Sequence, residues 1–234
     1  MYRYLLLLLL ISSACHRDKK LIAPVAEPSV ANNNWMQPDS LPTGWHKLNK
    51  LFITGDFDGN GKADTLREGM LLQLTHTEID SVPDSLINSF ETSLRWYDKQ
   101  KAEVYVAFTK PNHDTLFLGN AAGLYCLINL GDLNKDGKDD IALSRDNLDF
   151  SNVGSCHFYT LCKGQWIQAG SIQIHESAFD LYVGDSISVF KNVPGFLEKQ
   201  NGQWYYEDYL EQNTFTSDTP PVRKKLVIRP CEKL

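Results

Sequence analysis

Two segments of the chain repeat one pattern of acidic and amide side chains. The first spans residues 55–64 and reads GDFDGNGKAD, and the second spans residues 131–140 and reads GDLNKDGKDD. Both fit the pattern D-x-[DN]-x-[DN]-G-x-x-D, which places side-chain oxygens at alternating positions of a tight turn. Calcium takes six to eight hard oxygen ligands, and a loop of this kind points alternating carboxylates inward. Each segment is therefore predicted to form a calcium site.

The glycine and the lysine near the middle of each segment have separate expected roles. Gly61 and Gly137 should permit the sharp turn that wraps the loop around an ion, because glycine tolerates positive φ. The following lysine should supply its backbone carbonyl as a ligand. We expect the ammonium groups of Lys62 and Lys138 to point away, since a cation beside the site would compete with calcium.

The same spacing also begins an EF-hand loop, but the flanking sequence argues against one. An EF-hand requires a bidentate Glu at the twelfth loop position, where this chain has Arg67 and Leu143. Strand-like rather than helical sequence flanks both loops. Loops of this pattern between strands resemble the FG-GAP or VCBS repeats of integrin α-chain propellers. Turns that need only Asn and Gly are the alternative interpretation.

The resemblance covers only the sequence around the two loops. It implies that each loop joins the first two strands of a blade and binds one Ca²⁺. Carried over residue by residue, with the lysines acting through their carbonyls, it implies these ligands: Asp56, Asp58, Asn60, Lys62 and Asp64, then Asp132, Asn134, Asp136, Lys138 and Asp140. The second loop lies in the more regular strand pattern, so we expect it to contribute more to stability.

Strand patterns dominate the chain beyond Trp45. Short β-branched or aromatic runs bounded by Gly, Asn and Asp predict strands at residues 47–54, 65–75, 103–108, 115–118, 124–130, 141–144, 156–161, 166–174, 195–199, 203–207 and 225–229. Lys163-Gly164 and Asn201-Gly202 are typical of tight hairpin turns. Only two loop signatures occur, too few for a closed propeller. We therefore expect a mostly β fold of two blade-like antiparallel sheet units, each with a calcium loop between strands.

One short helix is expected over residues 83–94. Pro83 suits the first turn of a helix, and Ser81 could cap it. Apolar side chains recur at helical spacing and predict a stripe that packs into the core: Leu86, Ile87, Phe90 and Leu94.

The N-terminus has the layout of a bacterial lipoprotein signal. A start that contains Arg3 precedes an apolar run over residues 5–11, and small residues then lead to Cys15. That run is too short to span a bilayer core of roughly 30 Å. We expect cleavage after residue 14, lipidation of Cys15, and a proline-rich disordered tether over residues 15–44 before a domain at 45–234.

The residues after Cys15 give an expected location. This layout resembles small Bacteroidetes lipoproteins with such loops. His16 is not Asp, so analogy with enterobacterial sorting favours the outer membrane. Residues 17–20 do not resemble the acidic surface-export tags of Bacteroidetes lipoproteins, which favours a periplasm-facing position. The expected partner is therefore the membrane, through the N-terminal lipid.

Composition narrows the function classes. The net charge of −6 supplies no basic surface for phosphates, so we do not expect a nucleic-acid binder. The favoured role is a calcium-stabilised interaction or scaffold module with a protein or glycan partner. A carbohydrate-binding or adhesion module is the first alternative, suggested by Trp166, Trp204, Tyr205, Tyr206 and Tyr209. An enzyme is not expected, because Gly184-Asp185-Ser186-Ile187 resembles a GDSL esterase block but no His follows His175. A hydrolase with a site that no motif reveals is the second, less favoured alternative.

Four cysteines besides Cys15 can form disulfides in an exported protein. They are Cys126, Cys156, Cys162 and Cys231. Cys156 and Cys162 should not pair with each other, because an extended chain between them spans roughly 20 Å. Pairing of Cys126 with Cys156 or with Cys162 stays open, so the sequence does not fix the connectivity.

Overall fold

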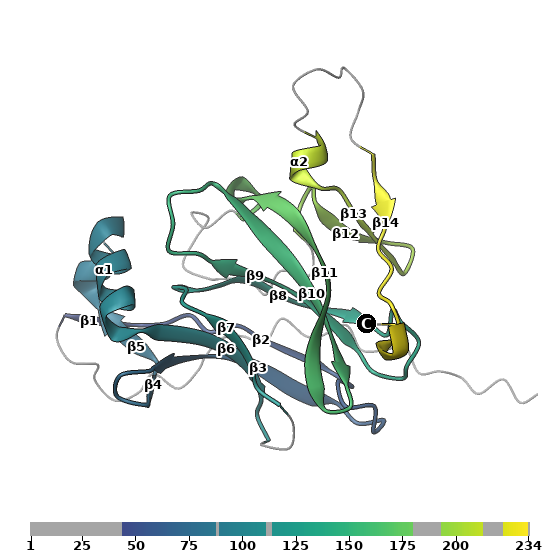
Figure 1. Ribbon diagram of the computed structural model, residues 1–234, viewed down its shortest axis with the longest axis horizontal. Coiled ribbons are helices and arrows are strands. Elements are labelled where there is room, and N and C mark those ends of the chain that lie inside the picture. Colours follow the sequence, from purple (N-terminus) through teal and green to yellow (C-terminus); the bar gives the residue numbers. More distant parts are fainter. Residues whose placement is uncertain (1–43, 88, 111–113, 180–192, 213–221, 234) are drawn as a thin grey trace, which may run out of the picture. The chain divides into compact units, whose positions relative to one another are not determined.

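The fold is mostly β, as the sequence predicts, and consists of several antiparallel sheets (Figure 1). The computed structural model describes residues 44–87, 89–110, 114–179, 193–212 and 222–233. Within these ranges there is no closed barrel or propeller. The predicted signal segment, Cys15 and almost all of the predicted tether lie outside the described residues, as does the esterase-like block at residues 184–187.

The first of the two predicted units is a five-stranded sheet. Its main order is β2-β3-β6-β7, and β4 pairs with β3 beyond the end of β2. The strands are β2 (Phe52–Gly55), β3 (Asp64–Leu72), β4 (Thr77–Ile79), β6 (Ala102–Phe108) and β7 (Leu116–Gly119). The first loop joins β2 to β3, so it lies between strands as expected.

The second unit is a four-stranded meander in the order β11-β10-β9-β8. Its strands are β8 (Gly123–Gly131), β9 (Asp140–Asp146), β10 (Val153–Cys162) and β11 (Gln165–His175). The second loop joins β8 to β9. Lys163 and Gly164 have φ of 51° and 84° and form the predicted tight turn between β10 and β11.

The β8–β11 sheet packs against other strands on both faces, and most side chains of β8, β9 and β10 are at least partly buried. One face packs with the first sheet and carries Leu127, Ile141, Leu143, Tyr159 and Leu161. The other packs with the C-terminal strands and carries Cys126, Ile128, Ala142, Cys156 and Phe158. Successive side chains of a strand point to opposite faces, so a strand buried on both sides must be apolar at nearly every position. This explains the almost unbroken apolar run of β8.

Smaller elements complete the described chain. A three-stranded sheet contains β12 (Leu197–Gln200), β13 (Gln203–Tyr206) and β14 (Lys224–Lys225), and Asn201-Gly202 forms the predicted turn between the first two. A two-stranded sheet pairs β1 (Trp45–Lys47) with β5 (Ser81–Pro83). The remaining short elements are α2 (Tyr209–Gln212) and the 3₁₀ turns η1 (Asp84–Leu86), η2 (Glu176–Ala178) and η3 (Cys231–Lys233).

The helix prediction is wrong in position. The helix α1 spans Phe90–Gln100, and its N-cap is Ser89, whose side chain accepts a hydrogen bond from Thr92 N. Pro83 instead ends β5, because pairing with β1 keeps that segment extended. The predicted core stripe is also wrong: Leu86 is buried, but Ile87 is 66% exposed and Phe90 is 42% exposed. Tyr97, on the true helix, is the buried residue.

The disulfide joins Cys162 at the end of β10 to Cys231 near the C-terminus. Cys126 and Cys156 are free thiols in the core. Cys126 on β8 and Cys156 on β10 both lie opposite Ser144 of β9, one on each side of that strand. Two strand spacings separate them, roughly 9.5 Å, which is beyond the reach of a disulfide without backbone movement.

Glu68 is a buried carboxylate that links the two sheets. It lies on β3 and is only 4% exposed. Its Oε2 accepts a hydrogen bond from Leu51 N, and its Oε1 accepts one from Leu124 N at the start of β8, each at 2.9 Å. Burial raises the pKa of Glu68 to about 7, against an ordinary value of 4.5, although the two amide donors and Lys50 act in the opposite direction.

This pKa predicts a pH-dependent contribution to stability. The folded state binds a proton with a pKa of about 7 and the unfolded state with one near 4.5. The stabilisation is therefore fully present below pH 4.5 and is lost as pH rises through 7, a change of about 3 kcal/mol. Relative to Glu68→Gln, the wild type should lose stability between pH 5 and pH 8 in urea denaturation. A stability difference that does not change with pH would contradict the assignment.

Candidate metal centre

The two loops fold in the same way. In each, the backbone N–H of position five donates to the side chain of position three: Asn60 N to Asp58 Oδ1 at 3.0 Å, and Asp136 N to Asn134 Oδ1 at 2.9 Å. The glycine N–H donates to the first aspartate, at 2.9 Å in the first loop and 3.0 Å in the second. The next N–H donates to position five, at 2.9 and 3.0 Å. The sequence repeat is therefore a structural repeat.

The glycines at position six adopt the conformation that the sequence predicts. Gly61 has φ of 78° and Gly137 has φ of 87°, both in the left-handed region. Only glycine enters this region without a steric penalty.

The first loop brings three carboxylates together. Asp56, Asp58 and Asp64 each offer one oxygen, and these oxygens lie within 4.8 Å of one another. Calcium–oxygen distances of 2.3–2.6 Å separate opposite ligands by roughly 5 Å, so a single ion can contact all three. Asp56 Oδ1 and Asp64 Oδ2 are buried and have no hydrogen-bond partner. Buried carboxylate oxygens without hydrogen-bond donors are expected at a cation site, because the ion takes the place of the donors.

The predicted residues at positions five and seven of the first loop lie at its solvent side. Asn60 and Lys62 are both exposed. The Asn60 amide donates to Asp58 Oδ2 at 2.7 Å, which holds the Asp58 carboxylate in place. The Lys62 backbone N–H donates to Asn60 Oδ1 at 2.9 Å, and this hydrogen bond fixes the peptide group between Gly61 and Lys62.

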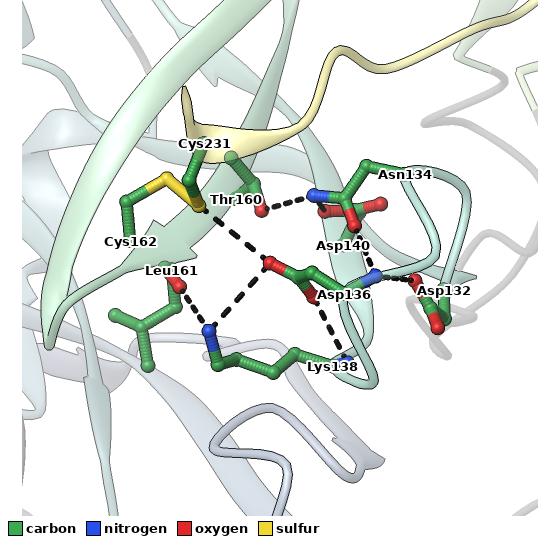
Figure 2. Close-up of a disulfide and its surroundings, with 9 residues drawn as sticks. All are labelled: Asp132, Asn134, Asp136, Lys138, Asp140, Thr160, Leu161, Cys162 and Cys231. Atoms are coloured by element: carbon green, nitrogen blue, oxygen red, sulfur yellow. Dashed lines mark hydrogen bonds and ion pairs between the residues drawn. A yellow bond between two sulfur atoms is a disulfide. The ribbon is translucent and has the colours of Figure 1, made fainter. Parts of the chain in front are cut away.

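In the second loop, protein groups form hydrogen bonds and an ion pair with the predicted ligand side chains (Figure 2). Asp140 is fully buried, and its Oδ2 accepts from Leu133 N at 3.0 Å. The Asn134 amide donates to Asp140 Oδ1 at 3.4 Å and to Thr160 Oγ1 at 2.9 Å. Burial raises the pKa of Asp140 to about 6, while the Thr160 hydroxyl and the backbone donors lower it.

The expectation that lysine points away is wrong for Lys138. Its ammonium lies 3.6 Å from Asp136 Oδ2 and donates to the Leu161 carbonyl at 3.0 Å (Figure 2). The fixed carbonyl at the end of β10 attracts the amine, which also neutralises Asp136. Cys231 Sγ lies 3.6 Å from the same oxygen, and a disulfide sulfur has no proton to donate. Cation binding here requires the Lys138 ammonium to leave Asp136.

The geometry thus favours the first loop over the second as the candidate metal centre. In the described part of the chain, its three aspartates are the group of acidic, histidine or cysteine side chains that converges closely enough to hold an ion. The second loop contains the same ligand types, but amide, hydroxyl and ammonium groups engage them. This is the reverse of the order that the regular strand pattern suggests.

Asp139 joins the two loops and was not among the predicted site residues. Asp56 N donates to Asp139 Oδ2 at 3.0 Å, and Asp139 N donates to the Asp56 carbonyl at 2.9 Å. Asn129 completes the junction, donating to Asp139 Oδ2 and to the Thr54 carbonyl, each at 2.9 Å. Gly55 has to lack a side chain, because a Cβ there would clash with the Asn129 amide and lie 2.5 Å from Asp139 Oδ2.

One sequence difference between the two loops points to this junction. Position eight is Asp139 in the second loop but Ala63 in the first. Residues 138–140 of the second loop are all polar, whereas the first loop has alanine at the middle position. This difference indicates that the Asp139 side chain has a role other than binding an ion.

The aromatic residues that suggested carbohydrate binding do not form an exposed platform. Trp166 is 8% exposed and stacks on Phe108, and Trp204 is 2% exposed and donates from Nε1 to the Leu130 carbonyl at 2.8 Å. Tyr205, Tyr206 and Tyr209 are half-buried. Both tryptophans therefore act as core residues.

Comparison with protein-family models, with curated proteins and with solved structures found no match. None of the helices in the described ranges has the length and apolar character needed to cross a membrane.

The junction between the loops should contribute to stability. Asp139→Ala removes an acceptor from the Asp56 N–H and from the Asn129 amide, so we expect a loss of about 2–3 kcal/mol in urea denaturation in the presence of chelator. Asp139→Asn keeps one oxygen acceptor and should lose less than half as much. Equal stability of wild type and the alanine variant would show that the junction carries no energy.

Proposed function

We propose that this chain is a calcium-stabilised envelope lipoprotein that acts as an interaction or scaffold module. The observation that carries the proposal is the first loop, where the oxygens of Asp56, Asp58 and Asp64 converge and two of them are buried without a donor. An integrin-like FG-GAP or VCBS identity of the loops is part of the proposal and rests on their sequence pattern. We do not propose an enzyme.

Calcium would act through charge and through connectivity. The three carboxylates repel one another, and a divalent ion removes that repulsion. Asp56 follows β2 and Asp64 begins β3, so an ion held by both ties the two strands at their shared end. Because Asp56 is also hydrogen-bonded to Asp139, the same ion would strengthen the contact with the second sheet.

The ligand set predicts weak binding of the kind found in extracellular modules. We expect Kd values of roughly 10⁻⁴–10⁻³ M. At free calcium about tenfold above Kd, one site adds on the order of 1.4 kcal/mol to the free energy of unfolding. Such a gain raises Tm by a few degrees.

Thermal melting of the full-length protein in detergent tests this proposal. The wild type should melt several degrees higher in millimolar calcium than in chelator. Asp58→Ala should abolish most of the gain, because it removes one of the three converging oxygens. Asp136→Ala should abolish less, because Lys138 already neutralises that carboxylate.

Two controls make the melting experiment specific. Asp98→Ala removes an exposed helix carboxylate outside both loops and should keep the full calcium gain. Magnesium should substitute poorly, because it demands tight octahedral geometry. If wild type melts at the same temperature in calcium and in chelator, the calcium proposal fails and the loops are turns only.

The anchor is tested separately from the metal. We propose a lipid on Cys15 that holds the protein at the outer membrane, facing the periplasm more than the cell surface. Cys15→Ala, expressed in a diderm bacterial host, should move the protein from the membrane fraction to the soluble fraction. A variant that still fractionates with membranes would show that the lipid is not the anchor.

A further inference from the structure

The outer face of the first sheet contains an open hollow of about 700 Å³. Leu66, Met70, Val104 and Val106 of β3 and β6 point into the core, so the alternate residues of these strands face outward. The hollow lies on this outer face and is lined by Arg67, His76, Glu78, Tyr105, Asp114 and Phe117, among others. Its volume falls within the range of small-ligand sites.

The polar groups of the hollow are held in place before any ligand arrives. Arg67 donates to both oxygens of Glu78, at 2.6 and 3.2 Å. The Tyr105 hydroxyl hydrogen-bonds to the same pair, and its ring lies over Gly69, where a Cβ would clash with it. The hydrogen bond from Arg67 lowers the pKa of Glu78 to about 2, so Glu78 is a carboxylate at neutral pH and accepts hydrogen bonds.

Phe117 adds an apolar surface beside these groups. It lies on β7, is 53% exposed, and its ring centroid is 5.9 Å from that of Tyr105. A half-exposed aromatic ring next to fixed planar donors and acceptors suits a ligand with an apolar face and hydroxyls at its rim. A pyranose ring has both, since its C–H groups gather on one face and its equatorial hydroxyls project outward.

The charges of the hollow favour a neutral ligand. Two cations, Arg67 and Lys50, lie 2.6 and 3.4 Å from Glu78 Oε1, and Asp114 is an additional exposed carboxylate, so the charges around the hollow cancel. An anionic ligand would have to draw these cations away from Glu78, whereas a neutral ligand would not. An added peptide strand would need the unpaired backbone groups of a sheet edge, whereas this hollow lies over the face of the sheet.

We propose that the hollow binds a neutral oligosaccharide, with Phe117 stacking on a sugar ring and the Arg67–Glu78 pair hydrogen-bonding to its hydroxyls. This gives the proposed interaction function a partner class, but it does not rest on the metal. None of the loop ligands lines the hollow. Failure of the calcium proposal and failure of this one are thus separable.

Affinity electrophoresis of the full-length protein in detergent tests the proposal. Native gels contain soluble neutral polysaccharides (xylan, glucomannan, mixed-linkage β-glucan or dextran) or, for comparison, anionic polygalacturonate. At least one neutral polysaccharide should retard the wild type, in chelator as well as in calcium. Phe117→Ala should weaken that retardation about tenfold in apparent affinity. Glu78→Gln should also weaken the retardation, because the Gln amide has one acceptor oxygen where the Glu carboxylate has two.

The matched control is Phe150→Ala, which removes another exposed phenylalanine that does not line the hollow. It should bind like the wild type. Retardation by no neutral polysaccharide of the panel, retardation by polygalacturonate alone, or equal binding of wild type and Phe117→Ala would each overturn the proposal. Circular dichroism of both alanine variants separates lost binding from lost fold.

Discussion

Strands β8, β9 and β10 lie between two covering layers, and their apolar side chains are buried on both faces. The first sheet covers one of these faces and the C-terminal strands cover the other, whereas the edge strand β11 keeps Gln165, Gln168 and Ser171 exposed. Each partner sheet contributes buried apolar side chains to a core that it shares with this middle layer. The disulfide from Cys162 to Cys231 holds the C-terminal chain close to the end of β10 and so supports the second cover.

The polar groups at the layer boundary follow from the same arrangement. Where the first sheet meets β8, the backbone N–H of Leu124 donates a hydrogen bond to the Glu68 carboxylate of β3. At the other end of β8, Asn129 and Asp139 supply the acceptors and donors for Thr54 and Asp56. The loops thus lie side by side because the strands that carry them do, and Gly55 permits the close approach.

Local chemistry explains what the sequence could predict. Most strand positions, both hairpin turns and the left-handed glycines follow from residue type and period, and they are confirmed. The strand predicted over residues 47–54 is wrong in extent, because it is divided between β1 and β2, and the one predicted over residues 225–229 is not a strand beyond Lys225. The short strands β4 and β5 were not predicted. The helix position depended on whether Pro83 starts a helix or ends a strand, and pairing with Trp45 across the chain decided it. The Lys138 contact with Leu161 and the Asp139 junction join segments distant in sequence, so no local pattern encodes them. The difference between Ala63 and Asp139 was visible, but its meaning required the second loop to lie beside the first.

The two copies of one loop motif have diverged because their surroundings differ. The second loop faces the end of β10, where a carbonyl, a hydroxyl and a disulfide crowd it, and its oxygens find protein donors. The first loop lies against the second loop instead, and its buried Asp56 Oδ1 and Asp64 Oδ2 have no hydrogen-bond donor among the described residues. Asp64 begins β3, and Arg67 follows on the same strand, paired across from Phe52. The hollow lies farther along the same strand and shares no residue with the loop, so the Arg67–Glu78 contact keeps its geometry whether or not Asp64 meets a cation.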